Sequence, residues 1–178
     1  MAEPSVEHLT AVEGGPLPLT TAGAPAAERD GRAVLERRIE GLFAAGREEQ
    51  FEEGMESEFS RGLVAIVEQH GDEAVAGIAD LILNEKVAAH VASEALVWLA
   101  TMDHPPSHDA RLRLLQQALF SRTLRTRDSA TVGLSAMDDP RAISDLKKAS
   151  SGEHYAYLRR DMEKVLGQLE STLPCRDS

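Results

Sequence analysis

The stretch LRTRDSATVGLSAMDDPRAISDL, residues 124–146, decides the fold because it contains the pattern of two helices and the turn between them. Its small and apolar residues recur every three or four positions, as they do on one face of an α-helix. Asp139 and Pro140 interrupt this pattern: the aspartate can cap the following helix, and the proline suits that helix's first position. The stretch therefore predicts a helix, a turn and a second helix.

The same apolar pattern recurs along the chain at a nearly constant interval. The equivalent positions are Leu63, Ala95, Ala130 and Met162, which are separated by 32, 35 and 32 residues. Further breaks are expected at Gly71-Asp72 and at residues 104–107, where Ser107 is expected to cap the next helix. We therefore predict an all-α fold, an α-solenoid of stacked antiparallel helix pairs with about eight helices. Ala95 and Ala130 should be buried at equivalent contacts between helices.

Residues 124–146 resemble the short HEAT-like repeat of bacterial type that also occurs in phycobilin lyases, and Leu158-Arg159-Arg160-Asp161 resembles the start of another unit. The resemblance implies that the second helix of each pair lines a concave surface. It also implies a non-catalytic scaffold for protein–protein interaction, or a regulator of a larger partner. The alternative that the same resemblance suggests is a tetrapyrrole (bilin) lyase or a subunit of one.

Charge is unevenly distributed along the sequence and bears on the kind of partner. The chain has a net charge of −11 and a pI near 5.0, which disfavours nucleic acid because polyphosphate binding depends on Lys and Arg. Residues 1–60 carry −8, residues 61–110 carry −6 and residues 111–178 carry +3. We therefore expect a protein partner with an acidic segment for the basic carboxyl-terminal part, and no nucleic acid.

Both ends of the sequence differ from its middle. Residues 1–30 are rich in Gly, Pro and Thr and are expected to form a disordered tail, and residues 173–178 a flexible one. The repeat domain should occupy residues 31–172. The single cysteine, Cys175, excludes an internal disulfide and fits a reduced compartment. With no apolar stretch of spanning length, we expect a cytoplasmic protein without membrane contact.

One short segment offers metal-ligating side chains. Residues 103–109 contain His104 and His108 together with two aspartates, a set that zinc could accept if the backbone folded back. The diproline between the two histidines favours an extended connector instead. Known phosphate-binding and nucleophile motifs are absent from the sequence. We therefore predict no metal, no cofactor and no catalytic residue, and hence a protein that is not an enzyme.

Two surfaces compete as the expected interface. One is an acidic helix face, made by Glu48, Glu49, Glu52, Glu53 and Glu56. The other is a polar, net-positive groove on the second helices, where Leu112, Leu115 and Leu119 should be buried and leave the opposite side chains outward. The predicted partner-binding residues of this groove are Arg113, Gln117, Arg141, Asp145 and Lys148.

Overall fold

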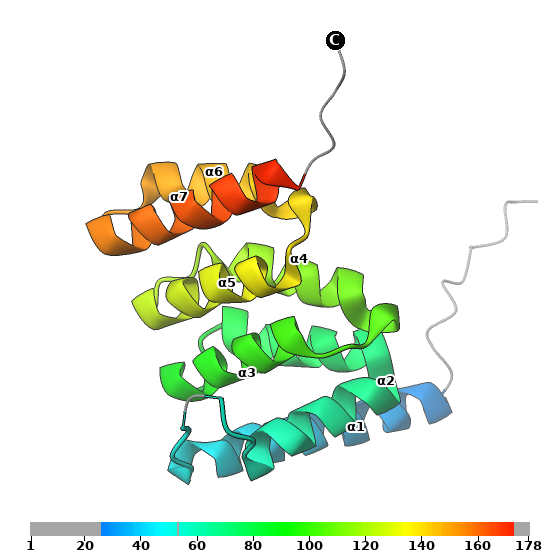
Figure 1. Ribbon diagram of the computed structural model, residues 1–178. Coiled ribbons are helices and arrows are strands. Elements are labelled where there is room, and N and C mark those ends of the chain that lie inside the picture. Colours follow the sequence, from blue (N-terminus) through cyan, green and yellow to red (C-terminus); the bar gives the residue numbers. More distant parts are fainter. Residues whose placement is uncertain (1–25, 53, 173–178) are drawn as a thin grey trace, which may run out of the picture.

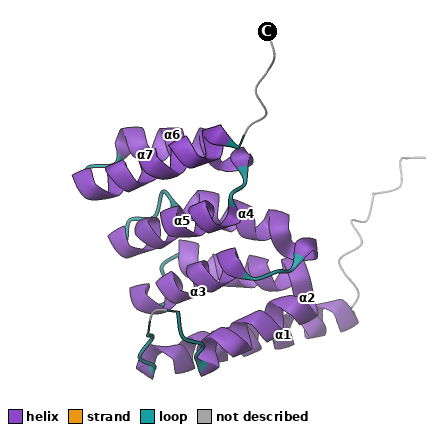
Figure 2. Cartoon of the chain, viewed as in Figure 1, coloured by secondary structure: helices purple, strands orange, loops and turns teal. Residues whose placement is uncertain are grey.

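The computed structural model describes residues 26–52 and 54–172, and in this part of the chain all regular structure is helical (Figure 2). Its α-helices are α1 (Ala26–Ala45), α2 (Glu58–Leu83), α3 (Ala89–Thr101), α4 (His108–Ala118), α5 (Leu124–Met137), α6 (Ile143–Gly152) and α7 (Ala156–Ser171). Short 3-10 turns η1 (Gly46–Glu48), η2 (Pro105–Ser107) and η3 (Pro140–Ala142) lie between them. The predicted all-α fold is confirmed for these residues.

The break predicted at Gly71-Asp72 is present as a kink inside α2. Gly71 has φ 53° and ψ −128°, a conformation that residues with a Cβ rarely adopt. The kink divides α2 into two helical halves that run in different directions (Figure 1). With these halves counted separately, the described residues contain eight helical segments, the number expected from the sequence.

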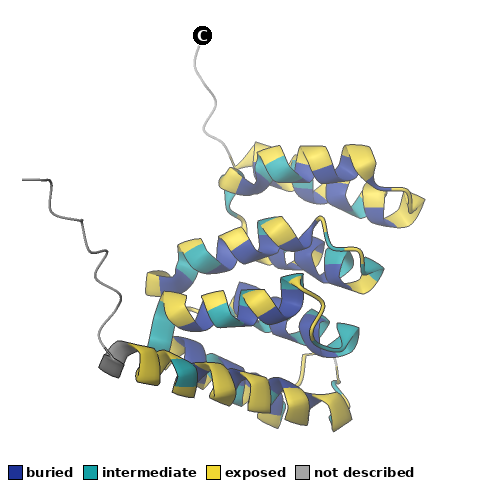
Figure 3. Cartoon of the chain, turned by 180° about the vertical axis from the view of Figure 1, so that it is seen from behind, coloured by how far each residue is buried: buried dark blue, intermediate teal, exposed yellow. Residues whose placement is uncertain are grey.

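The helices lie in layers that follow one another in chain order (Figure 1). On one side of the molecule α3 packs on α5 and α5 packs on α7, while α4 and α6 lie behind them. The buried residues lie where the helices pack on their neighbours, and the residues on the outer face of α1 are largely exposed (Figure 3). Ala95 and Ala130 are fully buried, as predicted, and the hydroxyls of Ser93 and Ser129 form a hydrogen bond between α3 and α5.

The closest packing in this region is found at Gly133 of α5. A Cβ at that position would lie 2.7 Å from Leu115 Cδ2 and 3.1 Å from the Ala100 Cβ. Both of these neighbours are buried, so they have little freedom to move away. The absence of a side chain at Gly133 therefore allows α3, α4 and α5 to meet.

We expect Gly133→Ala to lower the free energy of unfolding by about 1–2 kcal/mol, because overpacking outweighs the better helix propensity of alanine. The matched control is Gly167→Ala on α7, where an added Cβ would meet no atom within 4 Å. That change should stabilise the protein by up to about 1 kcal/mol. Urea unfolding of both variants measures the difference, and shifts of the same sign would contradict the packing described for Gly133.

Three local expectations require correction or refinement. The segment after η1, expected as an acidic helix, is irregular from Glu49 to Ser57, and Glu53 lies outside the described residues. Ser107 makes no capping hydrogen bond from its side chain, because its hydroxyl instead contacts His104 and Arg111. Helix α1 begins at Ala26, inside the segment 1–30 that was predicted as a tail. Residues 1–25 and the predicted tail 173–178 lie outside the described residues.

One side chain of the acidic segment stabilises the start of α2. Glu49 accepts hydrogen bonds from the backbone N–H groups of Glu58 and Phe59, at 2.9 and 3.1 Å, in the first turn of α2. A carboxylate is favourable there because the amino terminus of a helix carries partial positive charge. Phe51 packs its ring on Phe59. Glu49 is thus part of the fold and not of a free acidic helix face.

Candidate partner-binding surfaces

The predicted groove residues lie on α4, η3 and α6, but Arg141 is not a free cation. Its guanidinium contacts Asp139 at 2.6 Å and Asp109 of α4 at 2.9 Å, so it joins two layers. His108 Nε2 lies 2.9 Å from the same Asp139 carboxylate. Hydrogen bonds from Arg141 hold the pKa of Asp139 well below its usual range, although partial burial acts in the opposite direction. This network compensates the charge of Arg141 within the protein.

The remaining groove residues do not form a continuous basic surface either. Lys148 Nζ lies 3.8 Å from Asp145 on the same helix, about two turns beyond Arg141. Arg113 and Gln117 are exposed on α4, and neither side chain has a hydrogen-bond partner in the described residues. Leu112, Leu115 and Leu119 are buried, as expected. The groove therefore places one unpaired cation, Arg113, beside two compensated ones.

The two histidines of the connector have separate partners. His104 Nδ1 lies 2.8 Å from the Ser107 hydroxyl, whereas His108 contacts Asp139. Both line a hollow of about 260 Å³ beside Met102 and Met137. Among the described residues, no three His, Cys, Asp or Glu side chains come together in a way that could hold a metal ion.

Arg111, which was not predicted as a functional residue, is buried between the carboxyl end of α3 and the start of α4. Only 2% of the residue is exposed. Its guanidinium donates to the carbonyls of Leu99, Met102 and His104 at 2.6, 3.0 and 2.9 Å, and its Nε donates to Ser107. Burial lowers the pKa of Arg111, and the Asp103 carboxylate opposes that shift. The available sequence signal was its position four residues before Leu115, which the apolar spacing predicted to be buried.

The opposite edge of the molecule carries exposed aromatic side chains. It contains the turn from α4 to α5 and the turn from α6 to α7, which lie on the left in Figure 1. Phe120, Tyr155 and Tyr157 are 53%, 51% and 52% exposed. Phe120, Lys148 and His154 line one hollow of about 270 Å³ here. We call Phe120, Lys148, His154, Tyr155 and Tyr157 the turn edge.

A largely buried ion pair holds the two turns of this edge together. Arg127 of α5 donates through Nε and Nη2 to the two carboxylate oxygens of Glu153, at 2.7 and 3.1 Å. The remaining Arg127 nitrogen donates to the carbonyls of Ser121 and Arg122. Glu153 also accepts from the backbone N–H of Tyr155 at 3.0 Å. The hydrogen bond with Arg127 lowers the pKa of Glu153, and the pKa of Arg127 is raised for the same reason.

Three unpaired arginines are close in sequence to the turn edge. Arg122 lies in the α4–α5 turn, Arg125 in the first turn of α5 and Arg160 in the second turn of α7. All three residues are exposed, and within residues 26–52 and 54–172 their guanidinium groups make no hydrogen bond or ion pair. The signal that sequence analysis missed is the aromatic residues themselves, which stand in or beside short polar turns and outside the periodic apolar pattern.

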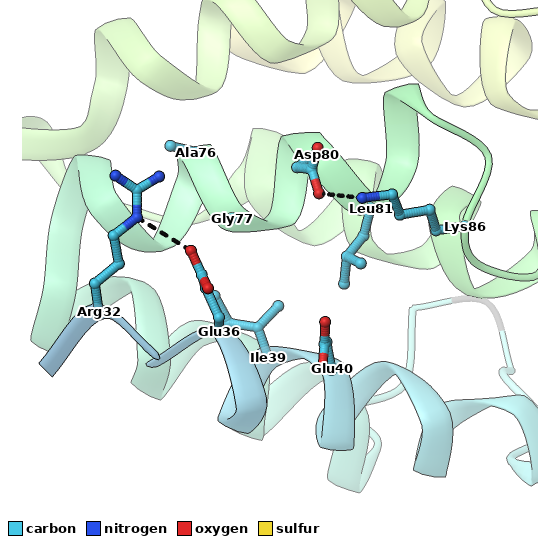
Figure 4. A pocket seen from close by; sticks show the side chains of 9 residues that line it. All are labelled: Arg32, Glu36, Ile39, Glu40, Ala76, Gly77, Asp80, Leu81 and Lys86. Atoms are coloured by element: carbon cyan, nitrogen blue, oxygen red, sulfur yellow. Dashed lines mark hydrogen bonds and ion pairs between the residues drawn. The ribbon is translucent and has the colours of Figure 1, made fainter. Parts of the chain in front are cut away.

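A further hollow of about 350 Å³ lies between α1 and the second half of α2 (Figure 4). Two ion pairs stand at its rim: Arg32 with Glu36 at 3.1 Å, and Lys86 with Asp80 at 2.6 Å. Ile39 and Leu81 line it between them. Most of its charged groups already have partners, which makes it a weaker recognition surface than the turn edge.

Comparison of the chain with protein-family models, curated proteins and solved structures found no match. None of the described helices is long and apolar enough to cross a membrane. The surfaces described above are therefore the basis for a functional proposal.

Proposed function

We propose that this protein is a non-catalytic protein-binding module, a HEAT-like α-solenoid of helix pairs that binds an acidic segment of a partner protein. The layered helices and the repeat of buried small residues support the solenoid part of the proposal. Stacked helix pairs expose long rows of turns and helix faces, which suit the recognition of an extended polypeptide. The resemblance of residues 124–170 to HEAT-like repeats favours the same architecture.

The observation that carries the proposal is the set of exposed aromatic rings at the turn edge, with unpaired arginines a few residues away in the sequence. Phe120, Tyr155 and Tyr157 leave about half of their surface open to solvent. Aromatic residues and arginine are the types most enriched among the residues that dominate binding energy at protein interfaces. The buried Arg127–Glu153 pair holds the turns that carry these rings, which reduces the ordering cost of binding.

Charge favours an acidic partner. The chain as a whole has a net charge of −11, yet Arg122, Arg125 and Arg160 are unpaired and lie within five residues of these rings in the sequence. Such a local positive patch increases the association rate with acidic segments and discriminates against basic ones. The proposed partner is still an acidic segment, as predicted from the sequence. The proposed binding surface is now the turn edge in place of the groove that contains Arg113 and Arg141.

The experiment compares two sets of surface variants for partner binding. We expect Phe120→Ser, Tyr155→Ser and Tyr157→Ser, combined in one chain, to weaken partner binding at least about 30-fold, the effect of losing one strong interface residue. The matched control combines Val34→Ser and Met55→Ser, which remove similarly exposed apolar side chains elsewhere. Affinity capture from the native host identifies the partner, and titration of that purified partner gives the dissociation constants.

Charge reversal tests the acidic nature of the partner separately. Arg122→Glu with Arg125→Glu should reduce the association rate, and the reduction should be largest at low ionic strength. Arg37→Glu with Arg61→Glu reverses exposed arginines on α1 and α2 and serves as the control. If the control variants lose binding while the turn-edge variants keep it, the proposed surface is wrong. The bilin-lyase alternative instead predicts an absorbance shift when a bilin is added.

A further inference from the structure

A second surface, separate from the turn edge, lies along the neighbouring helices α5 and α7. It is a groove of about 460 Å³, lined by side chains of both helices. Val132, Ala136 and Val165 form its apolar lining, and Val132 is 53% exposed. Val132 therefore adds an exposed apolar side chain to the lining of this groove.

One end of this groove is closed by hydrogen bonds between the two helices. The Ser135 hydroxyl donates to the Gln168 side chain at 2.7 Å, and the Gln168 amide donates to the Ser135 carbonyl at 2.9 Å and to Asp138 at 2.8 Å. Asp128 and Asp161 stand seven residues before Ser135 and Gln168 on their respective helices. The apolar floor between the two ends is therefore about 10 Å long.

The other end contains a carboxylate whose charge is not compensated. Asp161 pairs with Lys164 at 2.7 Å. Asp128, which is half-buried, has no hydrogen-bond or ion-pair partner for its carboxylate in the part of the chain that the structure describes. Burial raises the pKa of Asp128, and the nearby Asp161 carboxylate adds to the rise. This end of the groove therefore carries a net charge of one negative unit, from Asp128, Asp161 and Lys164 together.

We propose that the α5–α7 groove binds a lysine side chain of a partner polypeptide, with the ammonium group between Asp128 and Asp161 and the methylenes against Val132 and Ala136. Lysine fits both parts of the groove, because its stem is apolar and its head carries one positive charge. Removal of the Asp128 carboxylate from water is already partly complete in the free protein, so its pairing with a cation has less desolvation left to overcome. This site does not depend on the turn edge, and either can fail without the other.

The test uses n-pentylamine, which has the ammonium group and the alkyl stem of lysine, with n-pentanol as the uncharged control. Titration is followed by the NMR signals of the Val132 and Ala136 methyl groups. We expect saturable shifts with the amine, and a binding constant at least about 10-fold weaker with the alcohol or in Asp128→Asn. Glu163→Gln, an exposed carboxylate of α7 outside the groove, should leave amine binding unchanged.

Two controls belong to the same series: one checks that Asp128→Asn still folds, and the other tests whether the site binds an inorganic cation instead of an amine. Asp128→Asn removes an unpaired half-buried charge and should melt at the same temperature as the wild type or higher, so a loss of binding cannot be attributed to unfolding. Equal shifts with amine and alcohol, or unchanged amine binding in Asp128→Asn, would overturn the proposal. A third result would also overturn it: calcium chloride shifts the Asp128 and Asp161 carboxyl signals and the amine shifts none. The site would then bind an inorganic cation.

Discussion

Arg111→Met is expected to lower the free energy of unfolding by about 3–5 kcal/mol, which is a large fraction of the stability of a domain of this size. The variant keeps most of the apolar stem but removes every donor that the guanidinium supplies. The carbonyls of Leu99, Met102 and His104 would then lose these hydrogen bonds at a site that is partly to fully buried. Each buried acceptor without a partner costs about 1–3 kcal/mol. Urea unfolding monitored by circular dichroism measures the change.

Arg113→Met is the control, because Arg113 is exposed on the same helix and differs only in its direction. Its stability change should stay within about 0.5 kcal/mol. Arg111→Lys should fall between the two, because an ammonium keeps the charge but cannot reproduce the planar fork that reaches several carbonyls. If Arg111→Met and Arg113→Met had equal effects, the network around the end of α3 would not contribute to stability as described.

Arg127→Met should cost a similar amount, about 3–5 kcal/mol, for a different reason. The change leaves the Glu153 carboxylate without its cation, although only 3% of that side chain is exposed. An unpaired buried charge costs more than the ion pair itself contributes. The double variant Arg127→Met with Glu153→Leu removes both charges and should recover most of the lost stability. A double-mutant cycle from urea unfolding gives the coupling energy.

The same pair predicts the pH dependence of stability. The pKa of Glu153 is lowered in the folded protein, so the pair's contribution is fully present above the unfolded pKa, about 4.3, and is lost as pH falls through the lower folded value. The difference in unfolding free energy between the wild type and Glu153→Gln should therefore shrink as pH falls below about 4. A difference that stays constant between pH 6 and pH 3 would contradict a charged pair at this position.

Loss of the Arg127–Glu153 pair should also weaken partner binding at the turn edge. Arg127 holds the α4–α5 turn through the carbonyls of Ser121 and Arg122, while Glu153 holds the amide of Tyr155. These contacts fix the turns that carry Phe120 and the two tyrosines. The double variant that recovers stability lacks these hydrogen bonds, so its binding should remain weaker than that of the wild type. Measurement of both properties separates the contribution to folding from the contribution to the surface.

The sequence by itself predicted most of the helices and several of the breaks between them, because these depend on interactions within a few residues. The spacing of apolar residues placed Ala95, Ala130 and the leucines of α4 in the core, where all are buried. Asp139 accepts a hydrogen bond from the Arg141 backbone at 2.9 Å, as its place before Pro140 predicted. The break at Gly71 was equally readable, because glycine tolerates the backbone conformation found there.

Only the tertiary structure decided which polar residues remain available for a partner. Arg111 and Arg113 are two positions apart on one helix, and packing against α3 buries the first and leaves the second in solvent. Apart from its local contact with Asp139, Arg141 pairs with Asp109, a residue 32 positions away, and Arg127 pairs with Glu153, 26 positions away. Such pairs form only when successive layers bring distant turns together, so no local spacing in the sequence reports them. The same layering leaves Asp128 of α5 facing Asp161 of α7 without a cation of its own.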